Sequence, residues 1–382
     1  MVLPFLVNLL KGKSKYHIAL QFSQVMNMFV LALLTPYLIG ISEYGYYASI
    51  YSVPGFFQGM LETYLMLLLF NSGLSKSSLF HFGKIVILSF ILTSVVVYLT
   101  LGREIVFITL ILYSLMLLRS IALALAYHCL KVKVTSIILS ELIVFAVYGL
   151  IVLDVNFGSK VLGLSRTHNL PMIMVCSAAI PSAFFLFWKV KPYFNNLLIL
   201  DKDQPFDLHN LLARIYEDLF FSLAPLVTFK LFGSKTAGEY RFILSIFKGI
   251  SKLFPFKYEL LLRNIREGVF SFKSFKNFSF LFISFGIVTT ICLTLFIQMG
   301  YFNFISHMYL ILLSSGFVIT ILVVFPYAIT KFKSLPLITV LLYLFLYTAS
   351  YKMGISFFVY SFVLINAILY FIIYKKVISI NI

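Results

Sequence analysis

Three cations recur within one apolar stretch of the sequence, and their spacing determines where they lie. Arg241, Lys248 and Lys252 are seven and four positions apart, so in a helix all three share one face. At 1.5 Å per residue they span about 16 Å. Hydrocarbon does not accommodate three unpaired cations, so this cationic ladder predicts a watery face suited to an anion such as a phosphate. Pairing with carboxylates of the preceding span is the competing interpretation.

Five further charges lie within predicted spans, where a charge is costly and commonly functional. They are Glu62, Arg119, Glu141, Glu217 and Asp218. Arg119 has Glu62 or Glu141 as a plausible partner, and Asp218 follows Arg214 at the i, i+4 spacing of a helical ion pair. The four carboxylates are candidates for binding a coupling ion. Structural pairing explains the same pattern equally well.

Metal and thiol chemistry has little basis in the sequence. Cys129, Cys176 and Cys292 are isolated, and the six histidines form no HExxH pattern. No loop contains a Gly-rich phosphate cradle or a His–Asp pair. We therefore expect no metal, no cofactor and no enzymatic activity.

The elements that position these residues are apolar and long. Hydrophobic residues make up 61% of the chain and charged residues 11%, whereas soluble domains carry about 25% charged residues. Continuous apolar stretches of about 20 residues predict transmembrane helices rather than barrel strands. We expect an all-α membrane protein with about twelve helices. The predicted spans are 16–38, 46–70, 82–101, 104–128, 134–154, 170–188, 213–232, 240–262, 277–299, 303–329, 334–351 and 354–374.

The basic residues follow these spans regularly. Lysines and arginines gather after every second span, from Lys76 and Lys84 to Lys375 and Lys376, and the opposite loops hold few. Cytoplasmic loops of membrane proteins collect Lys and Arg, so both termini are predicted to be cytoplasmic. The same rule accounts for most of the formal net charge of +17. We therefore expect no nucleic-acid partner.

A short internal repeat divides the spans six and six. Gly40, Gly45 and Tyr47 correspond, at one constant offset, to Gly233, Gly238 and Tyr240. The repeat predicts an N-terminal six-helix lobe (1–190), a cytoplasmic linker (191–212) rich in Pro, Asn and Asp, and a C-terminal lobe (213–382). Two similar turns in apolar sequence are the simpler alternative.

The same offset predicts that the two halves differ at the ladder. Gly55 and Gly59 stand where the second half has Lys248 and Lys252. Small residues there would let helices approach closely or leave room for a bulky group. We expect an asymmetric cavity with its cations in one half.

The two turns resemble those of a known family. The segment "LLTPYLIG" followed by "SEYGYY" (33–47) and the "G-x4-G-E-Y" pattern (233–240) are similar to the turns that open the two halves of polysaccharide flippases. These are the O-antigen (Wzx-type) members of the superfamily that contains multidrug and toxic-compound extruders (MATE) and lipid II flippases. The chain is shorter than is usual for the family, and it has no room for the two further helices of lipid II flippases.

The resemblance implies a V-shaped, two-lobed transporter in the cytoplasmic (inner) membrane of a bacterium. It would turn an undecaprenyl-diphosphate-linked oligosaccharide between leaflets by alternating access, among membrane lipids and beside polymerase and chain-length proteins. By position, Arg241, Lys248 and Lys252 would hold the diphosphate, with Arg119 as a second choice. Glu62, Glu141, Asp218 and Glu217 would be the ion-coupling candidates.

Two other classes of function remain open at this point. A multidrug-type exporter of the same fold would favour an acidic cavity for cationic drugs, and the ladder is basic. A membrane enzyme of the same pathway, such as an O-antigen polymerase or a sugar acyltransferase, is the second alternative. Polymerases of that kind usually display a large external loop, whereas the longest hydrophilic connection here is predicted to be cytoplasmic.

Overall fold

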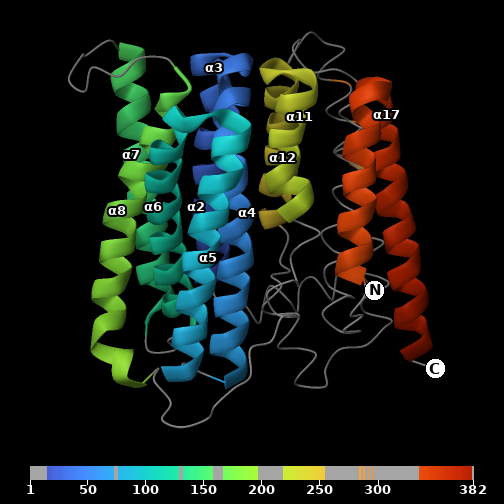
Figure 1. Ribbon diagram of the computed structural model, residues 1–382. Helices are drawn as coiled ribbons and strands as arrows, with labels where there is room; N and C mark the ends of the chain where they lie inside the picture. The colour runs from blue at the N-terminus through green and yellow to red at the C-terminus, as the bar shows by residue number, and fades with distance from the viewer. Residues whose placement is uncertain are drawn as a thin grey trace.

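Long helices running side by side make up the described part of the chain (Figure 1). The computed structural model describes residues 15–72, 76–128, 132–157, 167–196, 218–253 and 335–380, with single positions at 284, 287, 288, 291 and 295. These residues contain no strand, so the all-α fold class is confirmed for them. Twelve spans, two lobes and the N-in orientation stay predictions.

The first six predicted spans all correspond to helices. The first is a succession of α2 (Lys15–Met28), the π-helical η1 (Phe29–Leu34) and α3 (Thr35–Ile39). The next five are α4 (Ile41–Ser72), α5 (Lys76–Leu101), α6 (Arg103–His128), α7 (Val134–Phe157) and α8 (Asn169–Val190). A short 3-10 helix, η2 (Lys191–Asn196), follows α8.

The later part of the chain is described in two pieces. The first contains the π-helical η3 (Leu219–Leu223), α11 (Ala224–Phe232) and α12 (Ser234–Leu253). The second, α17 (Leu335–Ile380), is broken at Gly354, whose φ of 83° is non-helical. The break separates the predicted spans 334–351 and 354–374. The predicted span 303–329, nearly all of 277–299 and most of the 191–212 linker lie outside the described residues.

Three predicted spans start too late. The helix assigned to 46–70 begins at Ile41, the one assigned to 82–101 begins at Lys76, and the one assigned to 240–262 begins at Ser234. The added turns contain Ser, Glu and Lys, which lower the hydropathy without interrupting the backbone hydrogen bonds. Hydropathy therefore marked the part of each helix suited to lipid and not the whole helix.

The outer surface is suited to lipid. Six helical stretches are long and apolar enough to cross a membrane by length and composition: Phe22–Ile39, Ser77–Leu101, Arg103–Tyr127, Val134–Asn156, Asn169–Tyr193 and Leu337–Leu369. Large apolar side chains project from them, including Leu99, Phe107 and Phe184, which are 73%, 72% and 75% exposed. Such a surface is unfavourable in water and ordinary in a bilayer.

The two repeated turns have the same backbone. Gly40 ends α3 with φ 87°, and Gly233 ends α11 with φ 89°, a conformation that favours glycine. The amide of Gly40 donates to the Pro36 carbonyl and that of Gly233 to the Phe229 carbonyl, both at 2.9 Å. The similarity predicted from the sequence is therefore confirmed for these turns.

The helices that follow the two turns cross at glycines. A Cβ built on Gly45 would overlap the Ser234 carbonyl oxygen, and one built on Gly238 would overlap the Ile41 carbonyl oxygen. Gly45 corresponds to Gly238 in the repeat, and residue 41 corresponds to residue 234. The contact is therefore reciprocal, and a local pseudo-two-fold axis relates the two turns.

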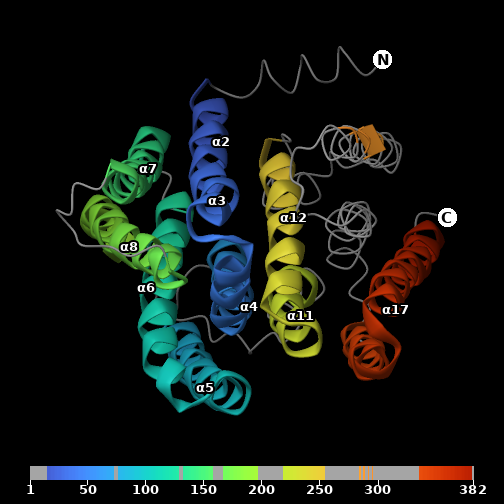
Figure 2. The same ribbon diagram turned by 90° about the horizontal axis from the view of Figure 1, so that it is seen from above.

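Helix α4 is central to the described structure. Seen from above, it lies between α6 on one side and α12 on the other (Figure 2). Helices α5 to α8 and α2 lie around one side of α4, α11 lies beside α12 and also contacts α4, and α17 lies farther out beyond α11. Tyr44, Tyr47 and Tyr240 are buried in the core between α4 and α12.

Candidate functional site

An ion pair joins α6 and α7, between the middle of α6 and the first third of α7. Arg119 Nη2 lies 2.9 Å from Glu141 Oε2 and 3.0 Å from Glu141 Oε1. Of the two partners suggested by the sequence, Glu141 is therefore the ion-pair partner. The Glu141 side chain is 4% exposed and the Arg119 side chain 26% exposed. The carboxylate is sealed inside the bundle, while part of the Arg119 side chain stays accessible.

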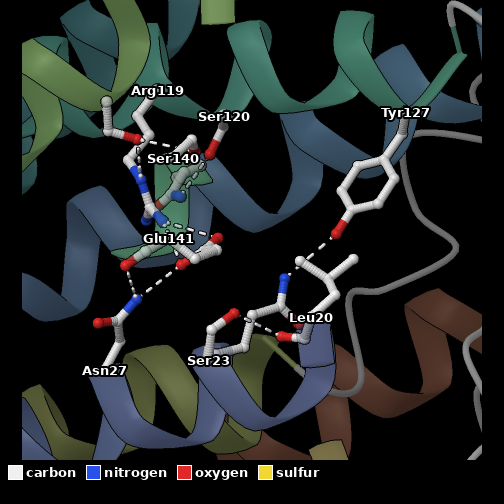
Figure 3. Close-up of polar contacts among 11 residues, drawn as sticks. Leu20, Ser23, Asn27, Arg119, Ser120, Tyr127, Ser140 and Glu141 are labelled. Atoms are coloured by element: carbon white, nitrogen blue, oxygen red, sulfur yellow. Dashed lines mark hydrogen bonds and ion pairs between the residues drawn. The ribbon is translucent and has the colours of Figure 1, made fainter. Parts of the chain in front are cut away.

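Two more helices complete this polar site. Asn27 of α2 donates from Nδ2 to Glu141 Oε2 at 2.7 Å and to the Glu141 carbonyl at 3.0 Å. Ser182 of α8 accepts a hydrogen bond from Arg119 Nε at 3.2 Å. Figure 3 shows Arg119, Glu141 and Asn27 converging between their helices. Hydrogen bonds from every side are what allow a charge pair to stay inside an apolar bundle.

A neighbouring carboxylate belongs to the same region. Ser120 donates to Glu62 Oε2 at 3.1 Å, and Gln58 Nε2 donates to the Ser120 hydroxyl at 2.6 Å. Gln58 and Glu62 are one turn apart on α4, so both reach α6 from the same face. Arg119 also lies within electrostatic range of Glu62. Arg119 therefore interacts with two carboxylates: it contacts Glu141 directly and Glu62 only at longer range.

The ion pair carries a prediction about stability. Arg119→Ala would leave the Glu141 carboxylate buried without its counter-charge, at a cost of about 3–5 kcal/mol. Removing both side chains together costs less than the two single changes predict, because neither charge is then left alone. Thermal unfolding of the single and double Ala variants in detergent measures this coupling. Arg103→Ala, at the exposed start of the same helix, is the matched control, and equal losses for Arg103 and Arg119 would contradict the assignment.

Asp218 lies at the start of η3 and contacts α4. A Cβ built on Gly59 would lie 2.5 Å from Asp218 Oδ1 and 2.7 Å from Oδ2. Glycine at position 59 therefore makes room for the Asp218 carboxylate. The space expected at this position is occupied, in the described structure, by an acidic side chain of the second half.

Arg241, the first cation of the ladder, faces α4. Its guanidinium carbon lies 5.0 Å from the centroid of the Tyr51 ring, a cation–π distance. The Tyr51 ring in turn covers Gly55, where an added Cβ would lie 2.7 Å from Tyr51 Cε1. The absence of a side chain at Gly55 therefore leaves room for the Tyr51 ring. The Arg241 guanidinium packs against that ring inside the protein.

Tyr51 lies at the point where charges of both halves come within reach of one another. The charges within its electrostatic range are Arg241, Glu62, Arg119 and Asp218. Four of the residues selected from the sequence are therefore gathered around one aromatic side chain of α4. The sequence analysis did not select Tyr51, because 43 Phe and 24 Tyr offered no basis for preferring one ring.

The other selected residues are described less fully. Lys248 and Lys252 lie on α12 with Arg241, so the helix that sets their common face is present. Their side chains, and the whole of Glu217 and Arg214, lie outside the described residues. Asn27, Ser120 and Ser182 were missed, although each is a polar residue within an apolar span, which was a usable signal.

A separate polar contact lies outside the spans. Glu43, in the first turn of α4, accepts a hydrogen bond from the backbone N–H of His168 at 3.0 Å and lies 2.9 Å from His168 Nδ1. The bond to the His168 ring, and then the backbone bond, hold the pKa of the Glu43 carboxyl below its ordinary value. The contact ties the start of α8 to the start of α4. Among the described residues, no three His, Cys, Asp or Glu side chains are grouped to hold a metal ion.

Comparison with protein-family models, with curated proteins and with solved structures gives no match to this chain. Its class therefore follows from helices, composition and site alone. Apolar helices with an ion pair sealed between them define an all-helical, multi-pass membrane protein.

Proposed function

We propose that this protein translocates an undecaprenyl-diphosphate-linked oligosaccharide, such as an O-antigen repeat unit, across the inner membrane of a bacterium. The path would run between the two halves, and alternating access would expose it to each side in turn. Polymerase and chain-length proteins of the same pathway would use the product. Arg241, Lys248 and Lys252 would bind the diphosphate, with Arg119 as a further candidate.

The reciprocal packing of the two repeated turns carries this proposal. Structurally similar halves related by an axis along the membrane normal are typical of transporters. The turns at 40–45 and 233–238 share one backbone conformation and contact each other reciprocally, which supports a relation of this kind between the halves. The same turns hold the sequence patterns that resemble polysaccharide flippases.

The charges near the junction of the halves support an anionic substrate. Arg241 faces α4 from α12, where the ladder continues toward Lys248 and Lys252. Arg119 keeps part of its side chain accessible although it pairs with Glu141. Cations within a bundle favour a phosphorylated headgroup over the cationic substrates expected of a multidrug exporter.

Loss of the protein would separate the proposed function from its alternatives. Without a translocase, lipid-linked repeat units accumulate in the cytoplasmic leaflet and no surface polysaccharide forms. Without a polymerase, single repeat units still reach the surface, and without a drug exporter the polysaccharide is unchanged. Deletion followed by analysis of surface polysaccharide and of lipid-linked intermediates distinguishes these outcomes. Surface display of single units in the deletion strain would refute translocation.

The distribution of charge between the two helix ends supports the proposed orientation. The ends at the turns after residues 39, 101 and 232 contain both signs, with Glu43, Arg103, Glu104, Lys230 and Lys235. The opposite ends carry Lys76, Lys84, Lys133, Lys189, Lys191, Lys375 and Lys376. Because basic ends stay cytoplasmic, the repeated turns would face the periplasm.

A reporter fusion tests this orientation directly. Lys202 follows an even number of predicted spans, so a reporter joined after it should lie in the cytoplasm. Alkaline phosphatase, active in the periplasm, and green fluorescent protein, fluorescent in the cytoplasm, give opposite signals at the same site. A fusion between residues 158 and 166, after an odd number of predicted spans, is the matched control and should give the reverse pattern. Phosphatase activity after Lys202 would overturn the topology.

A further inference from the structure

We propose that the two repeated turns form a gate, closed in this structure, that opens to the turn side when the halves separate. The gate consists of residues 40–47 and 233–240. This inference rests on the proposed function for its purpose, since a gate serves a translocation path. Its geometry comes from contacts across the two halves.

The described backbones of the two halves approach each other closely in the gate. Each glycine of the crossing leaves room for a backbone carbonyl of the other half: Gly45 for Ser234 and Gly238 for Ile41. At the exposed edge of the crossing, the hydroxyls of Ser42 and Ser234 are 2.7 Å apart. Small residues at such a crossing let the two backbones touch directly, so no side chain at Gly45 or Gly238 interlocks the halves at these two positions.

Buried side chains, three of them tyrosines, seal the gate just inside the crossing. Tyr44 and Tyr47 are each 2% exposed, and Ala237 and Tyr240 are each 0% exposed. Tyr46 bridges the halves nearer the surface, because its ring lies 4.6 Å from His168 and 5.6 Å from Phe229. The turn side is therefore closed by packing over about two helical turns.

Each half also has a π-helical turn followed by a proline in the helical segment that carries its gate turn. The π-helical η1 precedes α3, and the π-helical η3 precedes α11. Pro36 and Pro225 lie at the second positions of α3 and α11. A π-turn lengthens the local hydrogen-bond ring, and proline removes a donor, so both are common places for a helix to bend. Tilting of α3 and α11 at these points would carry the glycine turns apart.

The alternative is a permanent joint at the same place. A joint would keep Ser42 and Ser234 together in every state, whereas a gate must part them during transport. A disulfide between these positions distinguishes the two, since it would arrest a gate and leave a joint unaffected. Their hydroxyl contact makes the pair suitable for cross-linking.

The experiment uses the full-length protein with Cys129, Cys176 and Cys292 replaced by serine. Ser42→Cys and Ser234→Cys are introduced together and oxidised in intact cells. Ile243→Cys, 1% exposed and about 13 Å along α12 from Ser234, reports opening through a membrane-impermeant maleimide. Each single cysteine variant is a control, and Glu43→Cys with His168→Cys is the matched pair within one half.

Oxidation of the 42–234 pair is expected to reduce surface polysaccharide at least tenfold, with recovery on reduction. Labelling of Ile243→Cys should fall by a similar factor in the oxidised protein. For the 43–168 pair, oxidised and reduced protein should give the same two readings, because that disulfide joins two elements of one half; the comparison is between redox states of one variant, since Glu43 itself belongs to the gate. The proposal is overturned if the oxidised 42–234 protein supports normal polysaccharide, or if position 243 is labelled equally, or not at all, in both redox states. Labelling of position 243 tests the gate without reference to polysaccharide, whereas the deletion strain tests the proposed function. The two proposals can therefore fail separately.

Discussion

Replacing Lys248 or Lys252 with alanine is expected to abolish surface polysaccharide while leaving the amount of protein in the membrane unchanged. Both lysines follow Arg241 on α12, and Arg241 faces the other half at Tyr51. A diphosphate carries several negative charges, and each charge-assisted contact to it is worth about 1.5–3 kcal/mol. Loss of one such contact lowers affinity by about one to two orders of magnitude.

Two further kinds of substitution refine this test: arginine at the same positions, and alanine at a lysine on another face of the helix. Lys248→Arg and Lys252→Arg retain the charge and should keep part of the activity, although the fork of Arg does not reproduce the ammonium group. Lys257→Ala is the control on the same predicted helix, because its spacing places it on another face. Normal polysaccharide in both single alanine variants and in the double variant would remove the ladder from the mechanism. Membrane protein levels, measured by immunoblot, exclude a folding defect.

Much of the helical framework could be predicted because the hydropathy of a stretch measures the same transfer from water to lipid that places a helix in the membrane. The helix assigned to 104–128 is α6, Arg103–His128, and the one assigned to 134–154 begins at Val134 as expected. The start of α4 was missed because Ser42 and Glu43 lie in its first turn, at the membrane surface. A helix needs backbone hydrogen bonds, whereas a hydropathy profile records transfer to lipid, so the two diverge where helices extend into water.

The candidate site was predicted less completely, because its contacts join helices distant in the sequence. Charge alone identified Arg119 and Glu141 as possible partners, and the described structure pairs them. Asn27 is uncharged, and its role in holding Glu141 depends on the approach of α2 to α7. Tyr51 matters because Arg241 crosses its ring from a helix about 190 residues away in the sequence, and no local pattern encodes that approach.

The glycine crossing gives the second large expected effect. Gly45→Ala places a methyl group against the Ser234 carbonyl and 2.6 Å from the Gly238 amide, and Gly238→Ala places one against the Ile41 carbonyl. The obstacles are backbone atoms, which cannot rotate away as a side chain can. Overpacking of this kind costs about 1–3 kcal/mol or more. Both variants should therefore melt several degrees below the unsubstituted protein in detergent.

Two other helical glycines provide the control for this comparison. Gly83 and Gly149 have no neighbouring atom within 4 Å of an added Cβ, and alanine favours a helix over glycine by about 1 kcal/mol. Gly83→Ala and Gly149→Ala should leave the melting temperature unchanged or raise it. Gly45→Ala combined with Gly238→Ala should lower it by less than the sum of the single effects, because the first methyl group already parts the two backbones. If all four single variants melted alike, α4 and α12 would not be in contact at these glycines, and the reciprocal relation between the two turns would fail with it.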